Sequence, residues 1–330
     1  MPGLLSSMTA GRGVIFTLHH VVHPSGDAFQ PNRLLEISPD FLRKAILRIR
    51  ARGYDIVHLG EVAERLKDPK SGRFCVLTFD DGYRDNLEIA YPVLKELDCP
   101  FTVYVATSMP DGTAELWWRV LEIVVASRAH LELKLNGTPM GFPCETPDEK
   151  YKTYEAIYWW LRSQSQDDQR SFIRDLAMLH DIDMASMVRR MAMSWDEVSV
   201  LARDSLCTIG AHTVKHFALA RIDADRARAE MLNSADILES YLPERPKHFA
   251  YPYGDPGSAS QREFEIAREC GFETAVTTRP GVLFTEHLDH MYALPRISLN
   301  GEFQAKRYLD GFLSGVPSLA FNKGRKLNIA

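Results

Sequence analysis

The sequence predicts an α/β fold in which parallel strands are wrapped by helices. Before about residue 111 and again after about residue 194, short apolar runs alternate with segments of helical pattern, as in chains built from βα units. Several apolar runs are followed at once by acidic, histidine or tyrosine residues, which is typical of a barrel whose carboxyl face carries the functional site. Between Asp111 and Ser194 the alternation stops, so we expect an insertion there.

The first stretch of alternation starts with a strand expected near residues 13–19. A helix is predicted over residues 39–52, because Ser38 can cap its first turn and apolar residues recur along one face. The remaining elements expected in this stretch are strands at 55–59, 74–79 and 101–106 and helices at 61–66 and 86–97.

The second stretch begins with the apolar run 207–211, which we expect to be a buried strand. It continues with helices expected at about 223–241 and 260–270 and with strands at 248–252, 274–278 and 292–299. The composition, 45% hydrophobic and 25% charged over 330 residues, suits one large globular domain or two small ones. We expect residues 1–330 to form a single domain with the insertion in one βα loop.

The expected insertion, about residues 111–194, is mainly helical in pattern. Helices are predicted at 116–126, 147–161 and 167–179, and a small strand at 131–139 with an Asn136-Gly137 hairpin turn. Loops that follow barrel strands can grow without disturbing the core. Four of the five tryptophans fall in this segment, at positions 117, 118, 159 and 160. They could form a wall or lid over the site, or a small satellite core, and the sequence leaves both interpretations open.

Two adjacent carboxylates, Asp80 and Asp81, close the apolar run 74–79 and are followed by Gly82. Neighbouring acids at a partly desolvated strand end resist joint ionisation, and a divalent metal ion would hold their charge. A solvated turn is the simpler interpretation of an Asp-Asp-Gly sequence taken by itself. The histidines described next favour the metal.

A second polar cluster, from His212 to His216, closes the apolar run 207–211. Two histidines four positions apart face the same way on a helical turn, a spacing that suits two imidazoles on one ion. With Asp81 they would make a two-histidine, one-carboxylate set that leaves a coordination position open for water, as a catalytic metal site requires. Asp81, His212 and His216 are therefore the predicted metal ligands.

These strings resemble a known family. Thr-Phe-Asp-Asp-Gly at 78–82, His-Thr-Val-Lys-His at 212–216 and Phe-Ala-Tyr-Pro-Tyr-Gly at 249–254 are similar to motifs of the polysaccharide deacetylases of carbohydrate esterase family 4, which include the nodulation-type chitooligosaccharide deacetylases. The resemblance implies a deformed (β/α) barrel of about seven strands. It also implies that Asp80 is the general base and that the backbone N–H of Tyr253 helps to hold the oxyanion. The metal bound by the three predicted ligands is usually zinc in that family.

Two departures from the family pattern concern the general acid and the support of the base. Most members take the acid histidine from near the C-terminus, but residues 311–330 contain no histidine. The first strand ends in His19 and His20, which resembles the permuted branch typified by poly-N-acetylglucosamine deacetylases. This likeness implies His19 as the acid, with His20 as its rival and a buried structural role as the alternative. Many members have an arginine where this chain has Ala250, and Arg296 could supply that charge or be an ordinary surface arginine.

The implied reaction is metal-dependent hydrolysis of N-acetyl groups on oligo- or polysaccharides that contain N-acetylglucosamine. A zinc ion lowers the pKa of a bound water to about 7, Asp80 would accept a proton from that water, and His19 would protonate the leaving nitrogen. The ion and the Tyr253 N–H would share the developing negative charge. Two alternatives stay open: a deacylase of another, lipid-linked N-acyl amino sugar, and a carbohydrate-binding homologue without catalysis.

Charge, cysteine use and hydropathy narrow the classes of partner. The net charge is −5 without a strongly basic block, which argues against nucleic acid. The five cysteines form no Cys-x-x-Cys pair, so we expect reduced, buried thiols. No apolar run approaches the roughly 18 residues of a membrane span, and residues 1–8 lack the pattern of a secretory signal. The sequence therefore predicts a cytoplasmic protein that acts on a carbohydrate.

Overall fold

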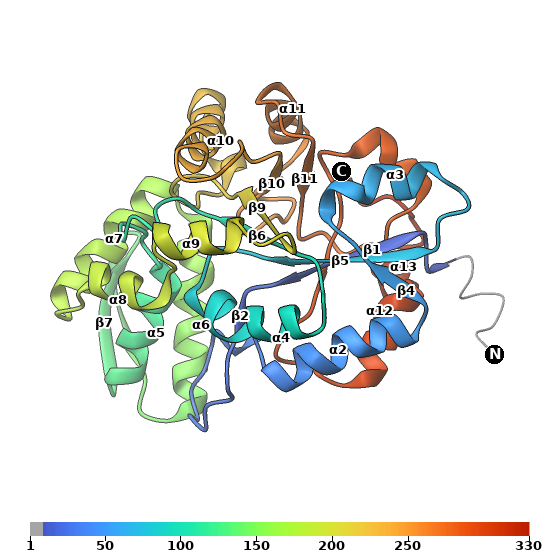
Figure 1. Ribbon diagram of the computed structural model, residues 1–330. Coiled ribbons are helices and arrows are strands. Elements are labelled where there is room, and N and C mark those ends of the chain that lie inside the picture. Colours follow the sequence, from blue (N-terminus) through green and yellow to red (C-terminus); the bar gives the residue numbers. More distant parts are fainter. Residues whose placement is uncertain (1–8, 330) are drawn as a thin grey trace.

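The core of the computed structural model, which describes residues 9–329, is a curled parallel sheet flanked by helices (Figure 1). In spatial order its strands are β11 (Thr274–Val276), β10 (His248–Ala250), β9 (Cys207–Ala211), β6 (Phe101–Val105), β5 (Arg73–Phe79), β1 (Gly13–Leu18) and β12 (Ile297–Ser298), with β4 (Tyr54–Ile56) beside the first half of β5. All of these pairings are parallel. The architecture confirms the predicted deformed (β/α)7 barrel.

The segment that ends in β12 joins the two edges of the curled sheet. The Leu294 N–H donates to the carbonyl oxygen of Ala275 in β11 at 3.0 Å, and Ile297 and Ser298 pair with Phe16 and Thr17 of β1. Only two residues of the expected strand 292–299 pair regularly, because the segment leaves one edge before it reaches the other. This explains both the closure of the barrel and its deformation.

Burial explains why the apolar runs become strands. Every residue of β5 from Phe74 to Phe79 is buried, because Cys75, Leu77 and Phe79 pack in one hydrophobic core and Phe74 and Val76 in another. A strand covered on both faces needs a continuous apolar run rather than an alternating one. Helix α2 (Pro39–Ala51) begins at Ser38, whose hydroxyl accepts from the Phe41 N–H at 3.1 Å, as the sequence predicts.

The other barrel helices largely follow the prediction. They are α3 (Val62–Lys67), α4 (Tyr91–Glu96) after a π-helical turn (Asn86–Ala90), α10 (Ala224–Glu239) and α11 (Gln261–Glu269). The expected strand 55–59 is shifted, since β4 ends at Ile56 and Leu59–Glu61 is a 3₁₀ turn. Outside the segment between β6 and β9, two strands and two α-helices were not predicted: β2 (His20–Val21), β3 (Glu36–Ile37), α12 (Lys306–Ser314) and α13 (Val316–Phe321).

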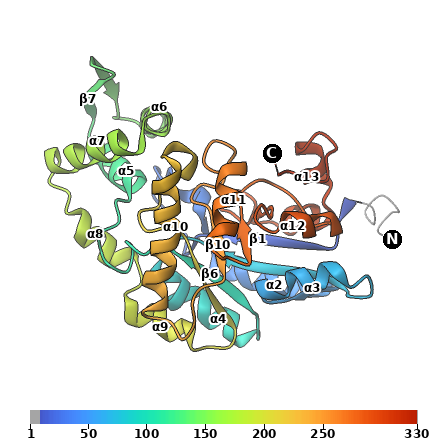
Figure 2. The same cartoon turned by 90° about the horizontal axis from the view of Figure 1, so that it is seen from above.

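Most of the elements between β6 and β9 gather on one side of the barrel, in shades from teal to yellow-green in Figures 1 and 2, and the last of them, in yellow, lies apart from this group in Figure 2. The elements of this segment are α5 (Trp117–Ser127), the hairpin β7 (His130–Leu135) and β8 (Thr138–Pro143), α6 (Pro147–Ser163), α7 (Gln166–Leu179), and the unpredicted helices α8 (Met184–Met191) and α9 (Trp195–Ala202). Asn136 and Gly137 have φ angles of 51° and 80°, as a two-residue hairpin turn requires. That the whole chain is one domain with its insertion at 111–194 stays a prediction.

The five cysteines are free in the described structure. Cys75, Cys99 and Cys144 are buried as expected, whereas Cys207 and Cys270 are partly exposed. Within residues 9–329, no helix combines the length and the apolar character needed to cross a membrane. The expectation that no secretory signal is present falls on residues 1–8, outside the described residues, and the cytoplasmic location stays a prediction.

Gly210 in β9 provides a test of how tightly the barrel is packed below the strand ends. A methyl group at this position would overlap the ring of Tyr104 and lie 3.0 Å from the carbonyl oxygen of His248. We expect Gly210→Ala to lower the free energy of unfolding by about 1–3 kcal/mol, as overpacking does, measured by urea denaturation. Gly60→Ala is the control, because its methyl would meet no atom closer than 3.8 Å. Equal effects of the two variants would contradict the packing described here.

Candidate active site

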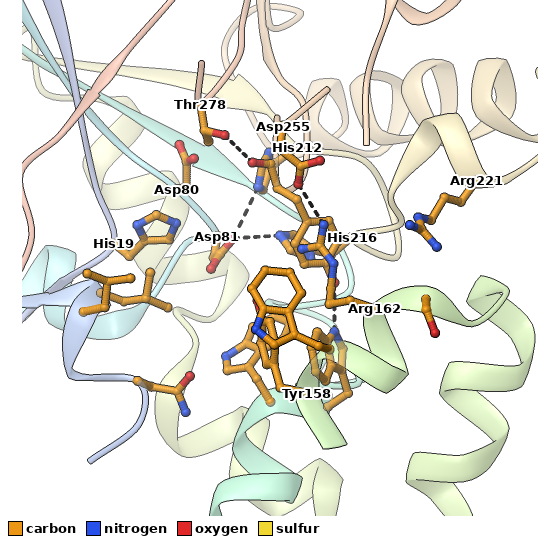
Figure 3. Close-up of a pocket in the computed structure, with 18 residues that line it drawn as sticks. His19, Asp80, Asp81, Tyr158, Arg162, His212, His216, Arg221, Asp255 and Thr278 are labelled. Carbon is orange, nitrogen blue, oxygen red and sulfur yellow. Dashed lines mark hydrogen bonds and ion pairs between the residues drawn. The ribbon is translucent and has the colours of Figure 1, made fainter. Parts of the chain in front are cut away.

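Strand register brings His19 next to Asp80. Leu18 and Phe79 are paired at the ends of β1 and β5, and the Asp80 N–H donates to the Leu18 carbonyl oxygen at 2.9 Å. The residue that follows each strand therefore emerges at the same edge of the sheet. Figure 3 shows His19 and Asp80 on one side of Asp81 and the imidazoles of the two predicted histidine ligands on the other.

The imidazole of His212 is fixed by the neighbouring strand β10. Its Nδ1 lies 2.7 Å from the carbonyl oxygen of Ala250, and because a carbonyl can only accept, Nδ1 carries the proton. The lone pair of Nε2 then points at Asp81, whose Oδ1 is 3.3 Å away. This is the arrangement of a histidine metal ligand, whose second ring nitrogen is held by a backbone oxygen.

The three predicted metal ligands converge. His216 Nε2 lies 3.2 Å from Asp81 Oδ1, and the ligand atoms of Asp81, His212 and His216 all lie within 4.8 Å of one another. Asp81 Oδ1 is buried and has no hydrogen-bond partner among the described residues, a costly state that a cation at this point would relieve. The site fits a divalent metal ion.

The segment that carries both histidines is a loop, so the expected helical turn is wrong. Thr213 and His216 have φ angles of 65° and 54°, in the left-handed region that a β-branched residue rarely adopts. The two imidazoles still face one carboxylate, because these two left-handed residues turn the chain back on itself. The spacing of four therefore predicted correctly that the two histidines converge, but the backbone that brings them together is a loop and not a helical turn.

Asp80 forms a buried ion pair with Arg296. Both carboxylate oxygens accept from the guanidinium at 2.6 Å, in the bidentate geometry that gives the strongest pairs. Arg296 also donates to Thr277 O at 2.9 Å and to Thr78 Oγ1 at 3.0 Å. Its side chain is 1% exposed, so the alternative of an ordinary surface arginine does not hold. Burial would raise the pKa of Asp80, but attraction and hydrogen bonds from Arg296 lower it.

His19 and His20, the two candidates for the general acid, have different surroundings in the structure. His19 lines the central cleft, and no hydrogen bond joins its ring to another residue in the range 9–329. His20 is turned away, with Nδ1 2.6 Å from Asp85 Oδ2 and its ring stacked on Tyr83 at 3.7 Å. Burial lowers the pKa of His19, against the opposing effect of Asp81 and Asp80. Of the two histidines, only His19 is placed to reach a ligand in the cleft.

Tyr253 lies at the mouth of the site with its backbone in the left-handed region, at φ 62°. Its N–H has no hydrogen-bond partner among residues 9–329, so it is free to donate to a ligand. Trp117 Nε1 donates to the Tyr253 hydroxyl at 2.8 Å, and the Arg162 guanidinium stacks over the ring at 4.1 Å. Helices α5 and α6 thus fix the side chain of Tyr253, a residue that lines the cleft.

A cleft of about 700 Å³ contains the predicted site residues except Arg296, which lies beneath Asp80. Its lining includes Leu34 and Leu35 from the first loop and aromatic residues of α5 and α6. Both interpretations of the insertion tryptophans hold in part. Trp117 and Trp118 are buried in a local core, against which Trp160 packs, and they also line the cleft. Trp159 lines the cleft and is 61% exposed.

Two contributors to the site were not predicted. Arg162 pairs with Asp255 at 2.7 Å on the cleft wall, and Glu230 of α10 accepts from the N–H groups of Val214 and Lys215 at 2.9 and 2.8 Å. Charged residues on charged helices look solvated in a sequence, so no local pattern marks either one. For Glu230, the only signal is its place in the register of α10, on the buried face.

The chain is similar to known proteins in sequence and in fold. A family model described as polysaccharide deacetylase matches residues 67–133 and 176–275. Poly-beta-1,6-N-acetyl-D-glucosamine N-deacetylase of Escherichia coli (strain K12) is 18% identical over 305 residues, 89% of this chain and 38% of that protein. The chain therefore spans well under half the length of this curated relative.

Two solved structures share the fold. The Streptococcus pyogenes deacetylase PplD in complex with acetate superposes with a TM-score of 0.59 at 18% identity, covering 91% of this chain and 96% of that one. IcaB from Ammonifex degensii gives a TM-score of 0.55 at 18% identity, covering 96% and 98%. At this level of identity the likeness supports the barrel architecture.

The buried pair predicts a large loss of stability when Arg296 is removed. We expect Arg296→Met to lower the free energy of unfolding by about 3–5 kcal/mol, because Asp80 is left as an unpaired buried charge. Urea denaturation at pH 7 measures the effect, and adding Asp80→Asn should restore part of it. Arg48→Met is the control, since its bidentate pair with Asp310 at 2.8 Å is solvent-exposed and should contribute little to stability. Equal losses in the two arginine variants would refute this account.

Proposed function

The chain belongs to the polysaccharide deacetylase family, and from this membership we propose that it hydrolyses N-acetyl groups of N-acetylglucosamine units in an oligo- or polysaccharide. The observation that carries the proposal is the convergence of Asp81, His212 and His216 next to an ionised Asp80 that Arg296 holds in place. This combination supplies a metal site and a separate base, as hydrolysis without a covalent intermediate requires.

We assign the metal to the ligand set Asp81, His212 and His216. Two imidazoles and one carboxylate with an open position favour zinc among the divalent ions. The ion would supply a lowered pKa for a water molecule and polarisation of the acetyl carbonyl. Asp81 contributes its unpartnered Oδ1, and His212 is already held in the tautomer that leaves Nε2 free.

Asp80 is the proposed general base. Each carboxylate oxygen has two lone pairs, and the Arg296 guanidinium uses one on each, so a lone pair remains to accept a proton from the attacking water. The pair lowers the pKa of Asp80, which reduces its proton affinity but keeps it ionised and fixed in direction. Arg296 thereby fills the role of the arginine that many family members have at the position of Ala250.

His19 and Tyr253 complete the proposed machinery. His19 faces the cleft next to Asp80 and would donate a proton to the departing sugar nitrogen. Burial lowers its pKa, which makes the imidazolium a stronger acid. The free N–H of Tyr253 would stabilise the developing oxyanion. The two proton-transfer groups stand on different strands, so their surroundings set their pKa values separately.

Trp159 is the proposed contact for a sugar unit beyond the reacting one. Its indole lies on the wall of the same cleft as the metal ligands and is mostly exposed, so its face is open to a ligand. Leu34 and Leu35 line the same cleft. A pyranose ring has an apolar face that can stack on an indole, and a contact beyond the reacting unit favours an oligomeric substrate.

Asp80→Asn tests the assignment of the base. We expect acetate release from an N-acetylglucosamine oligomer to fall by about 10²–10⁴-fold, the usual contribution of a general base, while zinc affinity stays within threefold of wild type. His216→Ala is the contrast, since it should lower zinc affinity itself. Turnover by Asp80→Asn at the wild-type rate would exclude Asp80 as the base, and wild-type zinc binding without acetate release would indicate a carbohydrate-binding homologue.

Trp159→Ala tests the second sugar contact. One aromatic contact is worth about 1 kcal/mol, so kcat/KM for a pentamer of N-acetylglucosamine should fall about 3- to 10-fold, with the monomer unaffected. Trp160→Ala is the control, because that indole donates to Asn136 Oδ1 at 3.0 Å and does not line the cleft. An equal loss for monomer and pentamer would contradict the assignment of Trp159.

A further inference from the structure

The insertion reaches the loop of the two histidine ligands through buried polar side chains of helix α7. Arg170 and Gln166 lie one turn apart on this helix, and each is only 3% exposed. A buried arginine needs several acceptors to offset its desolvation. The hydrogen-bond acceptors of Arg170 show which part of the chain it stabilises.

The Arg170 guanidinium donates to carbonyl oxygens of two segments, the ligand loop and the residues before α5. Nη2 donates to the carbonyls of Lys215 and His216 at 3.2 and 3.3 Å, and Nη1 donates to the carbonyl of Glu115 ahead of α5. Gln166 Oε1 accepts from the N–H of Ala218 at 2.9 Å. Helix α7 therefore holds the second half of the ligand loop.

The barrel itself holds only the first half of that loop. Besides the bonds to Glu230 described above, the N–H groups of Thr107 and Ser108, which follow β6, donate to the carbonyls of Thr213 and Val214 at 3.1 and 3.0 Å. For the carbonyl of His216, the partner in the described part of the chain is Arg170.

This loop needs external support because its backbone is strained. Left-handed conformations at Thr213 and His216 cost about 1–3 kcal/mol each and persist only where the surroundings over-determine them. One of the two strained positions is a metal ligand. The contacts of Arg170 are made at this ligand and at the residue before it.

The two histidine ligands are also anchored differently. His212 has its Nδ1 bound to a carbonyl oxygen, whereas Nδ1 of His216 is buried without a hydrogen-bond partner among residues 9–329. Ring contacts with Trp118 and Tyr253, at 5.4 and 4.9 Å between centroids, confine the His216 imidazole but do not set its direction. That direction follows from its backbone.

We propose that Arg170 is a positioning residue for the metal ligand His216, assisted by Gln166, so that the insertion forms part of the metal site. Arg170 acts through the carbonyl of His216 and touches neither metal nor substrate. The proposal rests on the proposed metal ligands and is independent of the substrate.

The test is the zinc affinity of Arg170→Met, measured by competition with a chromophoric chelator. We expect the affinity to fall about 10- to 100-fold, as on loss of an outer-shell partner, and Arg170→Lys to give a smaller loss. Arg174→Met is the matched control. Arg174 lies one turn later on the same helix, is 58% exposed and donates to the Glu115 carboxylate at 2.9 Å, so its loss should change zinc affinity less than threefold.

Two further measurements separate positioning from general destabilisation. In Co²⁺-loaded protein, Arg170→Met should change the visible absorption bands, which report ligand geometry, whereas Arg174→Met should not. If Arg170→Met does not fold, Gln166→Leu, which removes the acceptor for Ala218, takes its place with an expected loss of several-fold in zinc affinity.

The outcomes keep this proposal distinct from the proposed function. Zinc affinity in Arg170→Met within threefold of wild type, with unchanged Co²⁺ bands, overturns the role of Arg170 and leaves the deacetylase assignment intact. Equal losses in Arg170→Met and Arg174→Met overturn it as well. Wild-type protein that fails to bind zinc would instead refute the ligand set itself, and with it the proposed function.

Discussion

The ion pair between Asp80 and Arg296 links the closure of the barrel to the chemistry of its carboxyl face. Burying a carboxylate and a guanidinium costs several kcal/mol for each ion, and only complete pairing offsets that cost. Here two bonds of 2.6 Å join the ions, and two further N–H groups of Arg296 donate to Thr277 and Thr78. Arg296 comes from the segment that joins β11 to β1, so this segment can satisfy its charge only where it also closes the sheet.

Backbone strain concentrates at the same face. Among the eight non-glycine residues with positive φ in the described structure, four belong to the site: Asp81, Thr213, His216 and Tyr253. Each such residue costs free energy that its surroundings must supply. Part of the compensation is visible in contacts from the helices. Helices α5 and α6 contact the side chain of Tyr253, α7 donates to the carbonyl of His216, and α10 accepts from the N–H of Val214, next to Thr213. Contacts from the helices thus stabilise left-handed backbone conformations that the strands themselves do not contain.

The sequence predicted the parts of this protein that depend on local pattern. Fully buried strands require continuous apolar runs, so β5 and β9 were located within a residue or two, and the acids and histidines that follow them were recognised by type and spacing. The bond between Asp80 and Arg296 joins residues 216 positions apart, and only the closed barrel brings them together. The helical turn expected at residues 212–216 was wrong. The spacing of the two histidines indicates that they can lie close together, but it does not determine the φ angles of the residues between them. Helices α12 and α13 lie beyond the last motif and were not predicted.

The tryptophans and charges of the insertion show how one segment can serve both packing and binding. A lid must separate from the site that it covers, but opening here would pull Arg170 away from the carbonyls of Lys215 and His216. Each buried polar group left unpaired costs about 1–3 kcal/mol, and the strained ligand loop would lose its support in the same step. This cost argues for a fixed wall rather than a moving lid. One side of this wall exposes Trp159 in the cleft, and its buried side holds the loop that carries His216 through Arg170.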